Sequence, residues 1–381
     1  VVVGAGKGAA QMAAAFEDLW DGPVEGVVVT RYGYGRPTRS IRVLEAAHPV
    51  PDTAGLAATE ALFQAVAGLG EDDLVIALIC GGGSALLPAP PDGLALEDEQ
   101  SLNQALLASG APISAMNAVR KQVSRIKGGR LAAAAFPARV VSLVVSDVPG
   151  DDPAQVASGP TVPDSVDKAT AISLIDSNGI RLPARIAKYL ETSREAPAEA
   201  DPVFARNDVH VVASARLSLE AAADTARRAG LEAVILSDAI EGEARDVGLV
   251  HAAIARETRL RNRPFRPPVV ILSGGETTVT IRDRVGRGGR NAEFLLAFAG
   301  GIEGLKVTAI AADTDGIDGS EENAGAFADG SSWQRLRHAG HDPGGMLAGH
   351  DAWSAFDAIG DLFSPGPTGT NVNDFRAMLI R

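Results

Sequence analysis

Short apolar runs separated by glycine-rich or polar turns recur along the whole chain. They are rich in Val, Ile, Leu and Ala, as buried strands are. We expect strands at residues 1–4, 26–30, 41–47, 73–80, 140–145, 209–213, 233–237, 268–272 and 307–312. Longer segments of helical periodicity lie between many of these runs. Alternating strands and helices predict a layered α/β protein with parallel sheets.

The pattern also predicts two domains. The chain has 381 residues, whereas single hydrophobic cores stop growing near about 250–300 residues. Residues 181–208 mix Pro, Ala and charge without a clear period, so we place the boundary there. We expect a larger Rossmann-like parallel-sheet domain over residues 1–200. A smaller α/β domain follows over residues 205–381.

Composition narrows the class of protein. A net charge of −13 argues against nucleic acid or an anionic membrane as partner, because both attract basic surfaces. Cys80 is the single cysteine, which excludes a disulfide framework and favours a reducing compartment. No apolar run approaches the roughly 20 residues that span a bilayer, and no signal peptide is visible. We therefore expect a soluble cytoplasmic protein. The sequence leaves open a homodimer, and whether residues precede Val1.

The densest candidate chemistry lies in residues 273–291, SGGETTVTIRDRVGRGGRN. We expect a Gly-Gly turn after a buried strand, followed by Glu276 and Thr277. The arginines of this stretch are opposed only by Asp283, and Asn291 closes it. They are Arg282, Arg284, Arg287 and Arg290. Arginines clamp carboxylate or phosphate, and glycines turn backbone N–H groups toward ligands. The stretch indicates an anion-binding site, with a solvated hairpin loop as the alternative.

The first turn, residues 4–10, is similar to the dinucleotide pattern G-x-G-x-x-G/A. A dinucleotide site should carry an acid about 20 residues later to bind ribose, but the next predicted strand runs into Arg31. Arg31 would suit NADP, so a dehydrogenase stays open. Otherwise Lys7 is a lysine at a helix start, either exposed or bound to an anion.

Two further regions could hold an anion. The strand ending at Cys80 is followed by Gly81, Gly82, Gly83 and Ser84, and such a glycine run forms a nest of backbone N–H groups. We assign Ser84 a hydrogen-bonding role, because no nucleophile elbow is present. In the helix expected over residues 114–126, Arg120 and Lys121 belong to five cations with no acid between Asn117 and Arg130. This pattern favours an anion-facing stripe over a solvated helix face.

Acidic residues follow several predicted strands. Asp147 follows residues 140–145, and Asp313 and Asp315 follow residues 307–312. Carboxylates at strand ends can hold Mg²⁺ against phosphate, although turns also favour Asp. A calcium loop is excluded, because Ala324 stands where the loop needs Glu. Near the end of the chain, Asn371 and Asp374 are candidates either for ligand contacts or for a helix cap.

Taken together, these motifs resemble the glycerate 2-kinases, the family whose C-terminal domain is called MOFRL. The resemblance runs from Val3 to Phe375, and the MOFRL region would cover about residues 268–381. It rests on VGAGKGA, EAAHPVPD, CGGGSALL, NAVRKQVSRIKGGRLA, SDVPGDD, SGGETTVT, GRGGRNAEF, AADTDGIDG and GTNVNDF. Family members usually carry a helical segment ahead of the first block, which this sequence does not contain.

The resemblance implies transfer of a phosphoryl group from ATP, with Mg²⁺, to the 2-hydroxyl of D-glycerate, in a cleft between the two domains. The family's motif lysine maps to Lys7 and its motif arginine to Arg290, with Arg287 close by. The glycine run, Arg120 and Lys121 would hold phosphates or carboxylate. Asp147, Asp313 and Asp315 would bind Mg²⁺ or orient the hydroxyl. Members have also been labelled hydroxypyruvate reductases, so an NAD(P)H-dependent reductase remains the alternative, and a binding protein without catalysis is a third.

Overall fold

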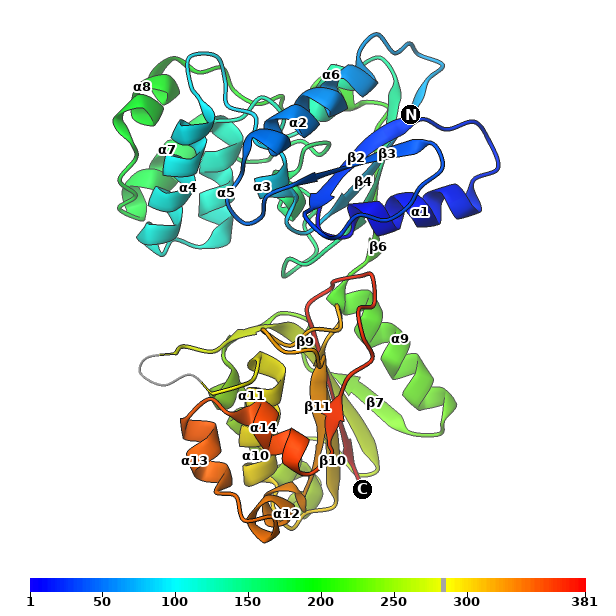
Figure 1. Cartoon of the computed structure of the whole chain (residues 1–381), viewed down its shortest axis with the longest axis vertical. Helices are drawn as coiled ribbons and strands as arrows, with labels where there is room; N and C mark the ends of the chain where they lie inside the picture. The colour runs from blue at the N-terminus through cyan, green and yellow to red at the C-terminus, as the bar shows by residue number, and fades with distance from the viewer. Residues whose placement is uncertain (282–285) are drawn as a thin grey trace. The chain divides into compact units, whose positions relative to one another are not determined.

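The computed structural model describes residues 1–281 and 286–381. It divides into two compact units, Val1–Val212 and Ala213–Arg381. Each unit is built on its own sheet (Figure 1), which confirms the predicted α/β class. Arg282 and Arg284 of the expected anion-binding stretch lie outside the described residues.

The first unit is a Rossmann-like layered domain. Its sheet has the strand order β3-β2-β1-β4-β5-β6, and the pairings among β1 to β5 are parallel. The strands are β1 (Val2–Ala5), β2 (Gly26–Arg31), β3 (Ile41–Ala46), β4 (Leu74–Cys80), β5 (Arg139–Val145) and β6 (Asp208–Ala213). Because parallel strands place their carboxyl ends at one edge, the turns after β1 to β5 meet there.

Helices cover this sheet and also form a separate lobe. Side chains of α2 (Thr53–Val66) and α6 (Arg130–Ala135) share one core with β1, β2 and β4, while α1 (Ala9–Leu19) packs on β2 and β4 from the other side (Figure 1). The lobe has its own apolar core, which includes Leu102, Leu106 and Ile186. It contains α4 (Leu96–Ser109), α5 (Ile113–Gln122), α7 (Lys168–Ser177) and α8 (Ala184–Thr192).

The second unit has a mixed sheet with the order β12-β11-β10-β13-β9-β7, and β8 pairs with β9. Its strands are β7 (Glu232–Ile235), β8 (Ile240–Glu243), β9 (Val269–Thr278), β10 (Val307–Asp313), β11 (Gly325–Asp329), β12 (Leu362–Phe363) and β13 (Asp374–Ile380). Strand β13 lies antiparallel between β9 and β10. Helices α10 (Ala244–Arg261) and α11 (Arg290–Gly301) share a core on one face, and α9 (Ala215–Arg228) packs on the other (Figure 1).

The expected Gly-Gly turn at residues 274–275 is wrong. Strand β9 continues through both glycines to Thr278, and Gly275 pairs with Asp374 on β13 and with Ile240 on β8. A Cβ atom at Gly275 would lie 2.2 Å from the Ile240 carbonyl oxygen, closer than any side chain allows. These glycines therefore permit close strand pairing instead of breaking the strand.

No helix within residues 1–281 and 286–381 is long and apolar enough to cross a bilayer.

Candidate active site

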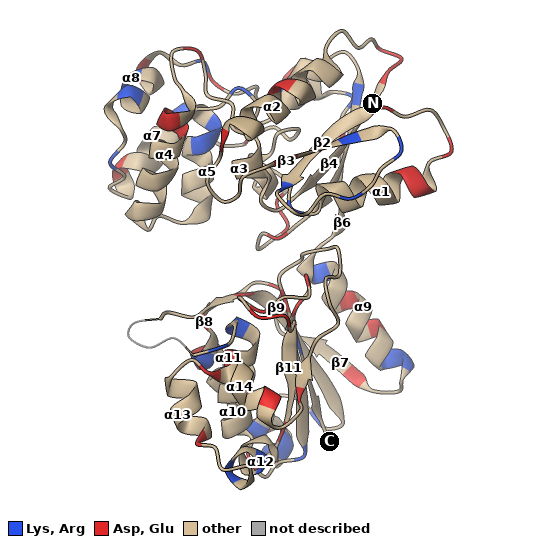
Figure 2. Ribbon diagram, in the orientation of Figure 1, with Lys and Arg blue, Asp and Glu red and all other residues tan. Residues whose placement is uncertain are grey.

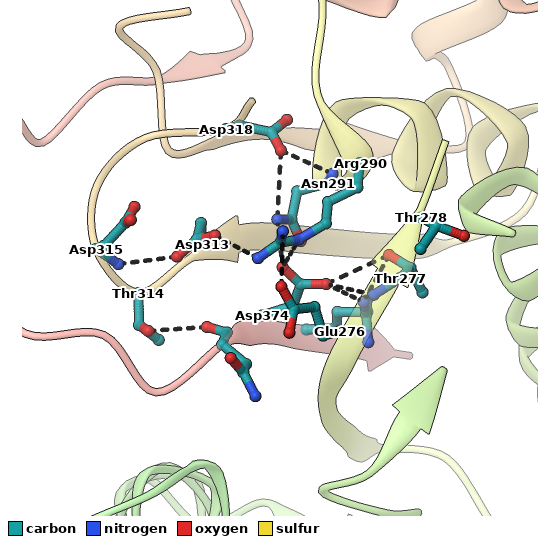
Figure 3. Close-up of polar contacts among 12 residues, drawn as sticks. Glu276, Thr277, Thr278, Arg290, Asn291, Asp313, Thr314, Asp315, Asp318 and Asp374 are labelled. Carbon is teal, nitrogen blue, oxygen red and sulfur yellow. Dashed lines mark hydrogen bonds and ion pairs between the residues drawn. The ribbon is translucent and has the colours of Figure 1, made fainter. Parts of the chain in front are cut away.

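The second unit gathers three carboxylates around one arginine. Arg290 is the first residue of α11, and its guanidinium reaches acids from three adjacent strands (Figure 3). Its Nε donates to Asp374 Oδ1 at 2.7 Å, its Nη2 to Asp313 Oδ2 at 2.6 Å, and its Nη1 to Glu276 Oε1 at 3.2 Å. Asp313 and Asp374 are direct partners in the β10–β13 register. The sheet therefore brings together residues from distant parts of this unit's sequence.

Asp374 is the centre of this cluster. Its carboxylate is completely buried and also accepts hydrogen bonds from Asn291 Nδ2 at 2.8 Å and from the Thr277 backbone N–H at 3.2 Å. A second arginine, Arg376, donates from Nη2 to Asp374 Oδ2 at 2.5 Å. Buried carboxylates need such compensation, because an unpaired buried charge is very costly.

Arg376 was not predicted from the sequence. Only 1% of its surface is exposed, and its guanidinium lies 5.0 Å from the centre of the Phe294 ring. Its Nε and Nη1 have no hydrogen-bond partner among the described residues, and burial lowers its pKa. The available signal was the period-2 pattern of β13, where Arg376 shares the buried face with Met378 and Ile380.

A further carboxylate fixes the start of α11. Asp318 accepts hydrogen bonds from the backbone N–H groups of Asn291 and Ala292, at 2.9 and 2.8 Å. Burial raises the pKa of Asp318 to about 6, although these hydrogen bonds oppose the rise. A Cβ atom at Gly289 would lie 2.3 Å from the Asp318 carboxyl carbon. One glycine of the RGGRN block is thus required by this helix cap.

The acidic turn after β10 has an unusual protonation equilibrium. Burial raises the pKa of Asp313 to about 7, Arg290 opposes the rise, and the nearby Asp315 and Asp374 add to it. Asp315 donates its backbone N–H to Asp313 Oδ1 at 3.0 Å, and its own Oδ1 accepts from the Ile317 N–H at 2.8 Å. Asp313 can therefore exchange a proton near neutral pH.

The described residues contain no group of three or more His, Cys, Asp or Glu side chains that could hold a metal ion. Mg²⁺ commonly uses one or two protein carboxylates, and waters and substrate phosphates complete its coordination. One oxygen of Asp313 is paired with Arg290. Its other oxygen accepts the Asp315 N–H. Asp313 and Asp315 therefore do not form a protein cage for Mg²⁺, and an ion bound here would take most of its ligands from substrate phosphates and water.

Two other predicted residues lie in this unit. Arg287 pairs with Glu321 at 2.6 Å, and its guanidinium stacks 3.5 Å from the centre of the Trp353 ring. Asn371 accepts a hydrogen bond from the Asn373 N–H at 3.0 Å, which is a local turn contact. The two arginines of this stretch that the structure describes, Arg287 and Arg290, are therefore both paired with acids from distant segments.

In the first unit, Lys7 lies against the glycine turn after β4. Its backbone N–H donates to the Gly81 carbonyl oxygen at 2.8 Å, and Gly82 has a φ of 83°. A Cβ atom at Gly81 would lie 1.7 Å from Asp147 Oδ2, so the carboxylate of Asp147 covers that glycine. These three residues therefore meet at the carboxyl edge of the sheet.

Gly83 and Ser84 begin the short helix α3 (Gly83–Leu86). The Ser84 hydroxyl lies 2.7 Å from the Ser158 hydroxyl. A Cβ atom at Gly83 would lie 2.5 Å from the Ala157 side chain, so glycine is needed there for packing.

The predicted unpaired basic stripe on α5 is wrong. Lys121 is fully buried and pairs with Asp164 at 3.2 Å, and Lys127 is buried against Glu99 at 2.6 Å. Arg120 donates from Nε to Asn103 Oδ1 at 2.8 Å. Acidic segments lie beside the basic ones in this lobe (Figure 2). These partners are distant in sequence, so local periodicity could not reveal them, and Lys121 faces the interior instead of a ligand.

The glycines of the first turn pack against β4. A Cβ atom at Gly4 would lie 2.5 Å from the Leu78 carbonyl oxygen, and one at Gly6 would lie 2.3 Å from Cys80 Sγ. The Gly8 N–H donates to Cys80 Sγ at 3.2 Å, and burial raises the pKa of this thiol to about 12. Close packing thus explains two glycines of the dinucleotide-like pattern without a ligand.

Comparisons with known proteins agree with this architecture. Residues 1–191 match the model of a domain of unknown function, DUF4147, and residues 269–374 match the MOFRL family. The chain is 52% identical to an Agrobacterium vitis protein named "Putative hydroxypyruvate reductase", in an alignment that covers the whole chain and 87% of that protein's length. It is 40% identical to a glycerate 2-kinase of Pyrococcus horikoshii, again over the whole chain and 87% of that protein's length. A crystal structure of a glycerate kinase from Thermotoga maritima matches with a TM-score of 0.91 at 38% identity, over the whole chain and 91% of that protein.

Proposed function

The chain belongs to the glycerate kinase family, and on that premise we propose that it transfers the γ-phosphoryl group of ATP to the 2-hydroxyl of D-glycerate. The products would be 2-phosphoglycerate and ADP. Full-length similarity to two glycerate 2-kinases, at 40% and 39% identity, supports the reaction class. The observation that carries the site is the convergence of Asp313 and Asp374 on Arg290.

Phosphoryl transfer requires positive groups that are held in place where negative charge builds up. Arg290 meets this need, because Asp374 and Asp313 fix its planar guanidinium while 24% of its side chain stays exposed. In our proposal it binds the substrate carboxylate or the transferred phosphoryl group. Glu276, Thr277 and Asn291 line the same cluster and would shape it.

The acceptor hydroxyl must lose a proton as the new oxygen–phosphorus bond forms. Asp313 is the best-placed acceptor, because its pKa is raised to about 7 and a general base works best near the operating pH. Lys7 and the N–H groups of residues 81–84 would bind phosphate or carboxylate oxygens. Asp147, beside Gly81, would orient the hydroxyl or a bound cation.

When bound, Mg²⁺ would neutralise the phosphate oxygens of ATP and help to align them. We propose that Asp315 holds it, with the phosphates completing its coordination, because Asp313 as a metal ligand would lose the raised pKa that suits it to act as the base. Asp147 is the third metal candidate from the sequence.

The test is a paired assay on the purified protein. One reaction contains D-glycerate, ATP and Mg²⁺, and the other contains hydroxypyruvate with NADH or NADPH. We expect ADP in the first reaction, and a phosphorus NMR signal of 2-phosphoglycerate without the 3-phospho isomer. Oxidation of NADH or NADPH in the second reaction alone would support the reductase and overturn the proposal. Formation of 3-phosphoglycerate would keep the kinase and overturn the position of transfer.

A further inference from the structure

Three nitrogen-bearing side chains meet at the carboxyl edge of the parallel sheet. Lys7 follows β1, Arg31 ends β2 and His48 follows β3, and these strands are neighbours in the sheet. A Cβ atom at Gly82 would lie 2.9 Å from Lys7 Cγ and 3.2 Å from His48 Nε2. The Lys7 and His48 side chains therefore pass over the same glycine.

No acid of the described chain pairs with these side chains. Within residues 1–281 and 286–381, none of the three makes a side-chain hydrogen bond or ion pair, and Arg31 only stacks 3.6 Å from the centre of the Tyr34 ring. The nearest acids on these segments are already engaged. Asp52 accepts from the Tyr32 hydroxyl at 2.8 Å, and Glu45 accepts from the Gly35 N–H at 2.8 Å.

The environment of His48 reflects this uncompensated charge. Burial, together with the positive charges of Lys7 and Arg31, lowers the pKa of His48 to about 4. At neutral pH the imidazole is therefore uncharged and still offers one N–H donor. A point charge, a planar guanidinium and a neutral donor around a glycine turn match the needs of an anionic oxygen group.

We infer that Arg31 and His48 complete, with Lys7 and the Gly81–Ser84 turn, a binding site for a carboxylate or phosphate group. The inference rests on the proposed kinase function, because it identifies the anion as the carboxylate of the hydroxy acid or a phosphate of the nucleotide. Arg31 supplies two parallel donors, Lys7 supplies the charge, and His48 fixes the orientation. Arg31 and His48 would then both contact the ligand.

Binding measurements test the site separately from turnover. We would titrate wild type, Arg31→Gln and His48→Gln with D-glycerate, ATP and inorganic phosphate by calorimetry. Hydrogen bonds to charged groups are worth about 1.5–3 kcal/mol, so each variant should weaken binding of one ligand by about tenfold or more. Loss confined to D-glycerate identifies the carboxylate, and loss for ATP and phosphate identifies the phosphoryl group. Arg36→Gln is the matched control: the residue is exposed on the same loop, and its affinities should change less than twofold.

Unchanged affinities in both site variants, with wild-type melting temperatures, would overturn the inference. A second measurement uses only the wild-type protein. The imidazole NMR signals of His48 should shift when it is titrated with whichever of D-glycerate, ATP or inorganic phosphate binds in the calorimetry. Absence of that shift also counts against the site. Normal ADP formation with unchanged affinities would remove the site and leave the kinase. If the site variants bind more weakly but the wild type forms no ADP, the binding site is supported and the kinase function is refuted.

Discussion

The two cationic centres of this chain are in opposite electrostatic states. Arg290 in the second unit is held by carboxylates of Asp374, Asp313 and Glu276. Lys7 in the first unit has no ion-pair partner among residues 1–281 and 286–381. Its neighbour Arg31 adds to the positive field, whereas His48 is uncharged at neutral pH. An arginine fixed by its protein partners can act without reorganising, whereas an unpaired lysine gains most when a ligand supplies the missing charge. We therefore expect that loss of Arg290 lowers both stability and activity, whereas loss of Lys7 lowers activity alone.

The largest effect should come from Arg290→Ala. The loss of this arginine should lower kcat/KM by about a thousandfold or more, as expected when a charge-stabilising group is removed. It should also lower the free energy of unfolding by about 2–4 kcal/mol, because buried carboxylates lose their partner. Steady-state kinetics and urea unfolding measure the two effects. Arg287→Ala is the stability control, since its half-exposed pair with Glu321 and its stacking on Trp353 should together contribute only about 1–2 kcal/mol. A wild-type free energy of unfolding in Arg290→Ala would contradict the expected difference between Arg290 and Lys7.

Lys7→Ala should separate activity from stability. We expect kcat/KM to fall about a hundredfold to a thousandfold, with the melting temperature unchanged or slightly higher, because no described acid loses a partner. Kinetics and thermal unfolding on the same preparation test this. A large fall in melting temperature would mean that Lys7 contributes to stability, as we expect for Arg290.

Lys121→Met tests the reassignment of the predicted basic stripe. Because Asp164 would be left buried and unpaired, the free energy of unfolding should fall by about 3–5 kcal/mol. The KM for ATP should change less than twofold, since Lys121 is enclosed in the lobe. The double variant Lys121→Met with Asp164→Leu should recover most of the stability. A raised KM for ATP in that stable double variant would restore Lys121 as a ligand contact.

The smallest effect concerns the cap of α11 and depends on pH. The pKa of Asp318 is raised to about 6 in the folded protein, so the folded state keeps this proton to a higher pH than the unfolded state. Protonated Asp318 therefore contributes about 3 kcal/mol to the free energy of unfolding below about pH 4, and this contribution is lost as the pH rises from 4 through 6. Asp318→Asn should abolish this component. Chemical unfolding of both proteins at pH 4 and pH 7 measures it, and parallel profiles would refute the assignment.

Local pattern predicted the parallel strands and the turns that carry the candidate residues. Strands at 73–80 and 140–145 lie close to where the apolar runs placed them, and Lys7 does meet the Gly81–Gly82 turn. The local pattern could not predict which distant residues pair with one another. Asp374 was left as a ligand contact or a cap, because its ion pair with Arg290 depends on the antiparallel insertion of β13 between β9 and β10. Lys121 was misassigned for the same reason, since Asp164 comes from a segment with no local relation to α5. The roles of these residues in catalysis remain predictions.

The burial of Cys80 has a practical consequence for following ligand binding. Its sulfur is enclosed by the first glycine turn, and a thiol whose pKa is raised to about 12 is almost entirely protonated and hence unreactive toward alkylating dyes at neutral pH. Because it is the chain's single cysteine, a cysteine introduced at any exposed position would be the only one to take a fluorophore or spin label. Each unit can therefore carry a reporter on an otherwise native chain, and occupancy of the Lys7 and Arg290 centres can be followed one at a time.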